Sequence, residues 1–450
     1  MTAAAPHTGR VHVVGAGLAG LAAAVALAGQ GRAVTLHESG THAGGRCRSF
    51  HDAELGCRID NGNHLLLTGN TAALAYIDQI GALDTFEPPA EAAIPFIDLV
   101  SGERWAIRPS RGAVPWWILS ARRRVPGTRA RDYLDMLKLW RAAPEDTLAD
   151  ALAPDTVLFR RLWEPLAVAA LNTGAAEASA PLFRHLLTQT IGRGAAACRP
   201  LLARQGLSES LVDPALAFLR ERGCEIRYGA RLRAIEFGRE RVTQLGFDGE
   251  TQPLGPTDSV VLAVPAAIAA RLVPGLIVPD DYAPIVNGHF RYDLPPDAPP
   301  FLGVVGGTAE WVFRKPGIAS VTVSAADRIV DRPAEELREV LWRDVTSALG
   351  LPPSAAPAAR IVKERRATFR ATPAQLKRRP AAATKWNNLQ LAGDYVDTGL
   401  PATIEGAIRS GFAAATQMGQ RSCSIFAATP VPASPPQSPA NLQECQRALP

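Results

Sequence analysis

The sequence lacks an apolar run long enough to cross a membrane. Its most apolar stretch, residues 260–278, is broken by Pro265 and Pro274 and carries Arg271. It therefore cannot supply the roughly 20 uninterrupted apolar residues of a spanning helix. Residues 1–9 show no charged segment followed by an apolar run, the pattern of a secretory signal. We expect a cytoplasmic protein, and any membrane contact to be peripheral, on the inner face of the membrane.

Other chemical signatures are missing as well. The six cysteines include no C-x-x-C pair, and no histidine–cysteine cluster has the spacing of zinc ligands, so we expect reduced thiols and no metal. No combination of Ser, His and Asp suggests a hydrolase. The net charge is only +5, without a dense basic tract among aromatic residues, which argues against nucleic acid as a partner. A mild positive bias still favours an anionic membrane surface.

The chain does contain enough apolar material for a large core. Of its 450 residues, 47% are hydrophobic and 20% are charged, which is ordinary for a globular protein. A chain of this length exceeds one compact core, so we expect two or three domains. The sequence shows no internal repeat. Residues 427–450 are rich in Pro, Ser and Ala, and we expect them to be disordered.

A dinucleotide-binding turn stands near the N-terminus. Residues 15–20 read G-x-G-x-x-G, directly after a short β-branched strand and before an Ala/Leu-rich helix. Gly15 permits the tight turn, Gly17 lets the backbone approach a pyrophosphate, and Gly20 lets helix and strand pack closely. The helix start offers free N–H groups to phosphates. Glu38 ends the second strand, at the spacing expected for a carboxylate that binds ribose hydroxyls.

The next segment favours a flavin over a nicotinamide. Gly44, Gly45 and Arg46 follow Glu38 after five residues, and Ser49 comes three residues later. This pattern resembles the E-x-x-x-x-x-G-G-R-x-x-S extension of flavin amine oxidases and isoprenoid desaturases. Adjacent glycines allow backbone contact with a cofactor, and an arginine can reach phosphate oxygens.

A third segment lies far along the chain. Gly393 and Asp394 follow a short strand, and residues 404–407 open a helix. The segment resembles the C-terminal flavin segment of the same superfamily. The resemblance implies that Asp394 binds the ribityl or pyrophosphate region and that the helix start faces the flavin pyrimidine. The sequence shows no second G-x-G-x-x-G, so we expect no separate nicotinamide domain.

Four local sequences narrow the resemblance to one family. They lie at residues 60–67 (DNGNHLLL), 162–173 (LWEPL to ALNT), 366–369 (RATF) and 394–407 (DYVDTGLPATIEGA). Together they resemble the squalene-associated FAD-dependent desaturases, the hydroxysqualene dehydroxylases of bacterial hopanoid synthesis. The resemblance covers about residues 10–415. It implies FAD as cofactor, an apolar isoprenoid substrate, and reductive removal of the allylic hydroxyl of hydroxysqualene to give squalene.

The same resemblance implies further cofactor contacts. Besides the residues of the three motifs, it assigns Asn63, Leu232, Thr403 and Ile404 to the FAD site. Two positions depart from the family pattern: Asn63 stands where the pattern has Gln, and Tyr395-Val396 stands where it has Trp-Thr. These departures concern the pocket around the flavin and leave the family assignment intact.

The implied reaction requires an acid, because hydroxide is a poor leaving group. An apolar tunnel would also keep water from the allylic cation that remains. Asp397 and His64 are the titratable residues that motif position places nearest the flavin, and we assign Asp397 as the acid with His64 second. The alternatives are a turn-forming Asp397 and a structural His64. Glu164 is a weaker candidate, while Asp60 and Glu405 favour structural roles.

These observations predict an α/β fold of the amine oxidase and isoprenoid desaturase type. An FAD-binding Rossmann-like domain would be assembled from residues 1–105, 200–270 and 385–426. An interleaved substrate domain would comprise residues 106–199 and 271–384. The sequence does not indicate an oligomeric state or the donor that reduces the flavin.

Three other functions remain open at this point. A carotenoid or phytoene-type desaturase would run the flavin oxidatively. A true amine oxidase usually places a lysine beside the flavin, and Lys315 is the best-placed lysine here. A lipid-binding module without catalysis would have lost the flavin, whereas every phosphate motif here is intact.

One segment suggests a membrane contact. Residues 114–119 (VPWWIL), which include Trp116 and Trp117, precede three arginines at residues 122–124. Apolar aromatics beside arginines are typical of proteins that sit on one leaflet, as a C30 hydrocarbon substrate would require. The alternative is a buried strand or helix edge beside a solvated basic turn.

Overall fold

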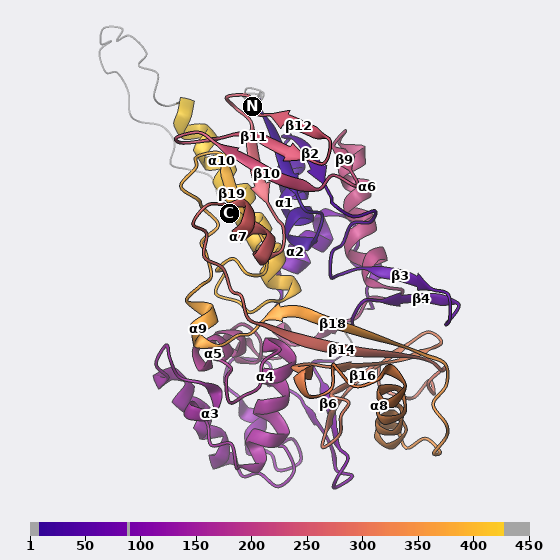
Figure 1. Cartoon of the computed structure of the whole chain (residues 1–450). Coiled ribbons are helices and arrows are strands. Elements are labelled where there is room, and N and C mark those ends of the chain that lie inside the picture. Colours follow the sequence, from indigo (N-terminus) through magenta and orange to yellow (C-terminus); the bar gives the residue numbers. More distant parts are fainter. Residues whose placement is uncertain (1–8, 88–90, 427–450) are drawn as a thin grey trace, which may run out of the picture.

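The computed structural model describes residues 9–87 and 91–426. The tail 427–450, for which we expect disorder, lies outside the described residues. Figure 1 shows two parts stacked along the long axis of the molecule. The upper part contains a parallel sheet and the lower part a mostly antiparallel sheet with helices, and the chain crosses between them several times. This is the α/β architecture that the cofactor motifs predict.

The upper part is built on a five-stranded sheet of order β19-β13-β1-β2-β9, in which all neighbours are parallel. Its strands are β1 (Arg10–Val14), β2 (Ala33–His37), β9 (Glu225–Arg227), β13 (Ser259–Leu262) and β19 (Leu389–Leu391). The central strands are rich in Val, Leu and Ile and are buried, as expected for a parallel sheet covered on both faces. The sheet combines three stretches of chain that lie far apart in the sequence.

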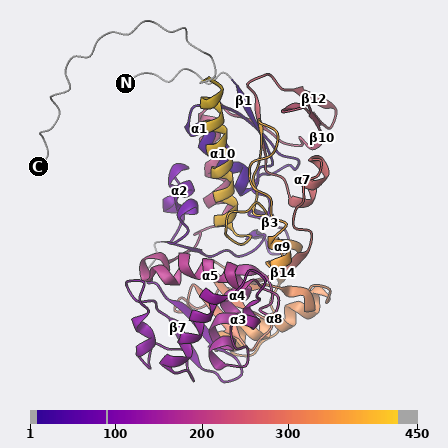
Figure 2. The same ribbon diagram turned by 90° about the vertical axis from the view of Figure 1, so that its left-hand side faces the viewer.

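Helices and a small meander cover this sheet. The helices are α1 (Leu18–Gly29), α2 (Thr71–Gln79), α6 (Asp213–Glu221), α7 (Ala266–Leu272) and α10 (Ile404–Phe426), and the meander comprises β10 (Leu232–Phe237), β11 (Val242–Phe247) and β12 (Glu250–Pro253). Figure 2 shows α10 running beside α1. The approach is close because α1 is Ala-rich and α10 presents Gly411, whose missing Cβ would lie 2.2 Å from the carbonyl oxygen of Ala19.

The lower part is built on a seven-stranded sheet of order β18-β14-β17-β16-β15-β6-β7, antiparallel except for the pair β15–β6. Its strands are β6 (Ile94–Asp98), β7 (Arg104–Ile107), β14 (Tyr282–Arg291), β15 (Phe301–Val305), β16 (Trp311–Lys315), β17 (Ile318–Val323) and β18 (Ala359–Phe369). Helix α8 (Ala334–Leu349) covers one face, and the helical segment of residues 116–193 covers the other.

The helical segment contains one unusual element. It comprises η2 (Trp116–Leu119), η3 (Ala130–Arg141), α3 (Leu148–Ala151), η4 (Phe159–Trp163), α4 (Glu164–Leu171), α5 (Ala180–Gln189) and two short turns, η5 (Ile191–Arg193) and η6 (Ala195–Ala197). Residues 130–190 are thus largely helical. Element η3 is a 3₁₀ helix of 12 residues, longer than such helices usually run.

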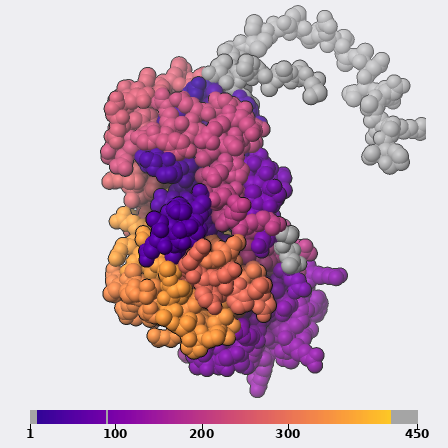
Figure 3. All heavy atoms as spheres, turned by 90° about the vertical axis from the view of Figure 1, so that its right-hand side faces the viewer, coloured from indigo at the N-terminus to yellow at the C-terminus, as the bar shows by residue number. Residues whose placement is uncertain are grey.

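Short strand pairs connect the two parts. The hairpin β3 (Ser49–Asp52) and β4 (Cys57–Asp60) reaches the surface between them, where Figure 3 shows indigo residues between the pink upper part and the orange lower part. A second pair joins β5 (Leu66–Leu67) to β8 (Pro200–Leu201). One expected boundary needs correction. Strand β6 lies within residues 1–105 and β7 begins there, yet β6 pairs with β15 and β7 pairs with β6 in the lower sheet. The first cofactor-domain segment therefore ends before β6.

The close packing of α1 and α10 leads to a prediction about stability. Gly411→Ala would place a methyl group 2.2 Å from the Ala19 carbonyl, so the helices must move apart, and we expect a loss of about 1–3 kcal/mol in the free energy of unfolding. Urea unfolding followed by circular dichroism measures this loss. Gly112→Ala is the matched control, since nothing lies within 4 Å of its added methyl. Equal stability of the two variants would contradict the packing argument.

Candidate functional site

The glycine-rich turn between β1 and α1 has the geometry of a phosphate cradle. Gly15 has φ +106°, and a Cβ on Gly20 would lie 1.8 Å from the Gly15 carbonyl oxygen, so both positions require glycine. A Cβ on Gly17 would have no neighbour within 4 Å, so the space in front of this residue is open. Helix α1 starts without a side-chain cap, which leaves its first N–H groups free for an anion.

Glu38 fixes the loop that follows β2. Its Oε2 accepts the Ala16 N–H at 2.9 Å and its Oε1 accepts the Gly40 N–H at 2.7 Å. The carboxylate is therefore held at the glycine turn, where the sequence predicts a ribose. Gly44 donates its N–H to the Ala16 carbonyl at 2.8 Å. The Gly-Gly-Arg segment is thereby anchored directly to the phosphate cradle.

An ion pair brings the N- and C-terminal motifs together. Nη2 of Arg46 lies 2.8 Å from Oδ1 of Asp394, and Nη1 of Arg46 donates to the Ala367 carbonyl at 2.5 Å. The Asp394 carboxylate raises the pKa of Arg46 above its usual value. The side chain keeps 48% of its surface accessible. The Arg46 guanidinium therefore remains open to contact with a bound cofactor.

The start of α10 completes this side of the cradle. Gly393 donates its N–H to Ser410 Oγ at 2.8 Å, and Thr403 Oγ1 accepts the Gly406 N–H at 3.1 Å, capping the helix. Ile404 begins α10 and is buried. Glu405 accepts N–H bonds from Ala72 and Ala73 at the start of α2, so it stabilises that helix end. The structural role predicted for Glu405 is confirmed.

Asn63 and His64 lie where the loop after β4 meets the lower sheet. Nδ2 of Asn63 donates to Ser320 Oγ at 2.8 Å and to Thr322 Oγ1 at 3.0 Å, while its Oδ1 has no partner among the described residues. Burial lowers the pKa of His64 to about 4, with a smaller effect of Lys315 in the same direction. The His64 imidazole is therefore neutral at pH 7, and it can donate a hydrogen bond without carrying charge.

Asp397 occupies a turn at the surface. Its carboxylate is 62% exposed, accepts the Gly399 N–H at 3.1 Å and lies 3.8 Å from Nη1 of Arg379. These contacts favour the alternative interpretation, a turn-forming aspartate. The apolar surroundings that would keep the carboxyl protonated at neutral pH are not found around this side chain in the part of the chain that the structure describes.

Asp60 has a structural role, and its carboxylate pairs with Lys315, the lysine that the sequence places best for a position beside the flavin. It is 3% exposed and accepts hydrogen bonds from Ser49 Oγ at 2.6 Å and from the Leu207 N–H at 2.9 Å. Nζ of Lys315 lies 2.5 Å from its Oδ2. Because the Lys315 ammonium is paired with Asp60, this lysine belongs to a structural ion pair. Leu232, at the start of β10, belongs to the apolar cluster that contains Val14, and its contact with the cofactor stays a prediction.

Several residues of the site were not identified from the sequence. Ser320 and Thr322 accept hydrogen bonds from the Asn63 side chain. Asn287, on the neighbouring strand, accepts a hydrogen bond from the Thr322 hydroxyl at 2.8 Å. One sequence pattern could have indicated them: hydroxyl residues stand at every second position, 320, 322 and 324, in an otherwise apolar stretch. Alternate residues of a strand share one face of the sheet, so these hydroxyls lie on the same side. The contact between Arg46 and the Ala367 carbonyl could not be predicted from the sequence, because any residue can supply a backbone oxygen.

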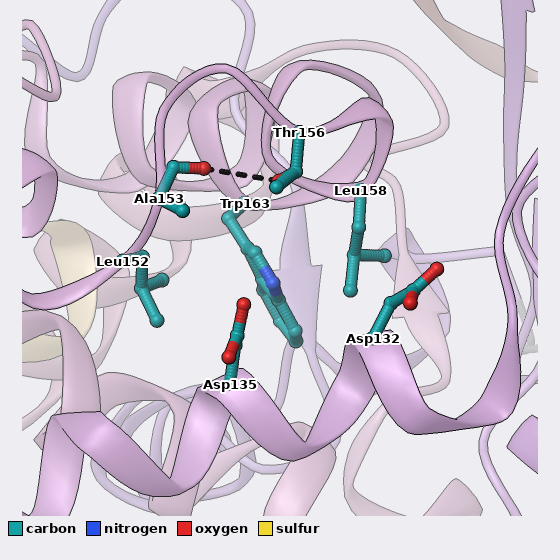
Figure 4. A pocket seen from close by; sticks show the side chains of 7 residues that line it. All are labelled: Asp132, Asp135, Leu152, Ala153, Thr156, Leu158 and Trp163. Carbon is teal, nitrogen blue, oxygen red and sulfur yellow. Dashed lines mark hydrogen bonds between the residues drawn. The ribbon is translucent and has the colours of Figure 1, made fainter.

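A separate pocket opens within the helical segment. It is lined by Asp132, Asp135, Leu152, Ala153, Thr156, Leu158 and Trp163 (Figure 4). Its carboxylates already have partners: Asp132 accepts the Arg129 N–H at 2.7 Å, and Asp135 pairs with Lys138 at 2.8 Å. The pocket lies apart from the cofactor motifs, and its polar groups serve local structure.

The cradle fits a dinucleotide by three independent features. The open space at Gly17 admits a pyrophosphate, Glu38 stands at the ribose position, and Arg46 keeps nearly half of its side-chain surface accessible. The unpartnered Oδ1 of Asn63 adds a buried acceptor at the junction with the lower sheet. Bound there, FAD would be held by the α1 N-terminus, Glu38, Arg46 and the start of α10.

Gly17→Val should abolish FAD binding without unfolding the protein. Its Cβ enters open space and its φ of −72° suits any residue, so the branched side chain excludes the pyrophosphate and little else. The absorbance spectrum of the purified variant should lack flavin, while its circular dichroism and cooperative unfolding persist. Gly112→Val, also without neighbours within 4 Å, is the control and should remain yellow. Full flavin content in Gly17→Val would refute the assignment of the cradle.

Comparisons with known proteins agree with this geometry. The family model described as flavin containing amine oxidoreductase matches residues 18–419. The chain is 48% identical to the hydroxysqualene dehydroxylase of Rhodopseudomonas palustris over 90% of this chain and 97% of that protein. It is 45% identical to the hydroxysqualene dehydroxylase of Zymomonas mobilis, with the same coverage of 90% and 97%.

A solved structure supports the fold alone. Cyclohexylamine oxidase from Brevibacterium oxydans superposes with a TM-score of 0.65 at 17% identity, covering 91% of this chain and 98% of that chain. The resemblances of the cofactor motifs and of the four local sequences are thus confirmed. The chain is an FAD-dependent oxidoreductase that belongs to the flavin-containing amine oxidoreductase family and, within it, to the family of the hydroxysqualene dehydroxylases.

Proposed function

We propose that this chain reductively removes the allylic hydroxyl of hydroxysqualene and releases squalene, as a step of hopanoid or triterpenoid synthesis. The observation that carries the proposal is the identity of 48% and 45% to two hydroxysqualene dehydroxylases over 97% of their lengths. The cofactor cradle supports it, because each motif needed to hold FAD is present in working geometry.

The reaction places defined demands on the protein. The C–O bond breaks as a proton reaches the hydroxyl oxygen, and water leaves. Reduced FAD supplies, when bound, the hydride that the allylic carbon accepts. The protein must therefore orient the hydroxyl, deliver the proton and exclude bulk water from the allylic cation. Phe301 and Phe313 of the lower sheet belong to the apolar cluster shared with the helical segment, and Leu65, in the loop between β4 and β5, packs against it. These apolar side chains favour a dry site of this kind.

We also propose a peripheral contact with the membrane, on its inner face, through one surface of the helical segment. This membrane-contact surface consists of the exposed side chains of Val114, Trp116, Leu119, Leu134, Leu137 and Trp140. More than half of the large apolar side chains that are exposed in the described part of the chain come from this region. Exposed arginines at 111, 122, 123, 131 and 141 border it, as suits an anionic leaflet.

The structure refines which aromatic residues can take part. Trp116 is 66% exposed, whereas Trp117 is 3% exposed and packs against Tyr133 with ring centroids 5.3 Å apart. Only the first tryptophan of the predicted pair is therefore available to a membrane. In the described part of the chain, none of the helices combines the length and hydropathy that crossing a bilayer requires.

The proposed reaction predicts a direct spectroscopic result. Enzyme reduced beforehand and kept free of oxygen should be reoxidised by hydroxysqualene, with the oxidised flavin spectrum returning in a single turnover and squalene appearing in equal amount. Phytoene added to the oxidised enzyme should leave the flavin oxidised, because only a desaturase would take electrons from phytoene. Absence of reoxidation by hydroxysqualene, or flavin reduction by phytoene, would contradict the proposed function.

The membrane-contact surface predicts cosedimentation with anionic liposomes. Trp116→Ser with Trp140→Ser should shift the protein to the supernatant, because two exposed indoles are removed without disturbing the core. Val100→Ser with Ile277→Ser is the matched control, since these side chains are 85% and 64% exposed but lie outside the surface. Binding that is equal in both double variants would place the contact elsewhere, and failure of the wild type to bind would refute it.

A further inference from the structure

Glu310 is an enclosed carboxyl group that the reaction described so far does not use. It lies directly before β16, and its Oε2 accepts the Ser324 N–H at 2.7 Å. Its own N–H donates to the Thr322 carbonyl at 3.3 Å. Glu310 thus bonds to the chain at one end of β16 and β17. This end lies next to Ser320 and Thr322, the hydroxyl residues that accept hydrogen bonds from Asn63.

The backbone beside Glu310 is strained. Asn172 and Ala325 are the non-glycine residues with positive φ in the described part of the chain, at +47° and +42°. They contact each other, since the Ala325 N–H donates to Asn172 Oδ1 at 2.6 Å. Ala325 follows Ser324, the residue that holds Glu310. Strain of this kind persists where the surrounding structure maintains it, often at functional sites.

Two routes link this region to the cofactor cradle. On one side, Asn172 Nδ2 donates to Thr368 Oγ1 at 2.9 Å, and the adjacent Ala367 carbonyl accepts from Arg46. On the other side, Asn63 donates to Thr322 Oγ1 at 3.0 Å, two residues before Ser324. The end of the sheet that carries Glu310 is therefore linked through hydrogen-bonded neighbours to Arg46 and Asn63, two residues of the candidate cofactor site.

The surroundings of Glu310 keep a large fraction of this carboxyl protonated near neutral pH. Burial raises the pKa of Glu310 to about 7, and the nearby carboxylate of Glu164 acts in the same direction, against the hydrogen bonds from Ser324. Burial also raises the pKa of Glu164 above its usual value, although Arg160 opposes the shift. Asp397 is exposed beside an arginine and His64 is neutral, so neither matches these surroundings.

We propose that Glu310 is the proton donor to the leaving hydroxyl. The inference rests on the proposed function. The Glu310 carboxyl proton passes to the hydroxyl oxygen, the allylic C–O bond breaks, and water departs. The allylic carbon receives its hydride from the reduced cofactor, which is thereby oxidised. The Glu310 carboxylate then recovers a proton from solvent.

The decisive experiment is oxygen-free, single-turnover reoxidation of prereduced enzyme by hydroxysqualene. Glu310→Gln should retain flavin yet react roughly 10²-fold or more slowly, the contribution of a general acid. Glu310→Asp keeps an acid and should recover part of the rate. Glu221→Gln changes an exposed glutamate at the end of α6 and should react as the wild type does. The wild-type rate should fall as the pH rises through about 7, whereas the slow Gln variant should be insensitive to pH.

A second readout does not depend on turnover. Because the pKa of Glu310 is raised on folding, the wild type should lose thermal stability relative to Glu310→Gln as the pH rises from about 5 through about 7. The difference between their Tm values measures this loss, and a constant difference would overturn the protonated state. A wild-type reoxidation rate in Glu310→Gln, with Asp397→Asn slowed instead, would overturn the proposal. Wild-type enzyme that is inert toward hydroxysqualene would refute the proposed function itself.

Discussion

The ion pair between Arg46 and Asp394 joins the parts of the molecule that must act together. Arg46 directly follows Gly44 and Gly45, and Asp394 follows β19, the last strand of the parallel sheet. Ala367, which accepts the second Arg46 hydrogen bond, belongs to β18 of the lower sheet. A planar guanidinium can satisfy both partners in fixed directions, which a lysine ammonium cannot do. The pair therefore sets the relative position of phosphate cradle, C-terminal flavin segment and substrate-side sheet, and the cofactor site depends on all three.

The parts of the fold that could be predicted are those specified by local chemistry. A turn with Gly15 at φ +106°, and a Gly20 too close to that turn for any side chain, leave a signature in sequence because no other residue suits these positions. Strand pairing is different. No local pattern indicates that β6 pairs with β15, some two hundred residues later. The domain boundary was therefore misplaced.

The cofactor side of the site was predictable and the substrate side was not. Motif position placed Asp397 near the flavin, but proximity along a motif says nothing about burial, and the carboxylate lies at the surface beside Arg379. The surroundings of Glu310 come from Ser324 and Glu164, which only the folded chain brings together. Desolvation depends on everything packed around a group. A sequence contains the residues of such an environment without indicating that they meet.

For the membrane contact proposed above, the 3₁₀ geometry of η3 sets how deeply the protein would sit in a lipid leaflet. With three residues per turn, Leu134, Leu137 and Trp140 project in one direction, about 6 Å apart along the axis. On an α-helix the same spacing would rotate each successive side chain by roughly 60° around the axis, so the three would enter the leaflet to different depths. Eclipsed side chains instead form a straight ridge with a single immersion depth. At the membrane contact that we propose, the enzyme would therefore slide along the bilayer at constant height, with its helical segment level above the lipid that holds a hydrocarbon substrate.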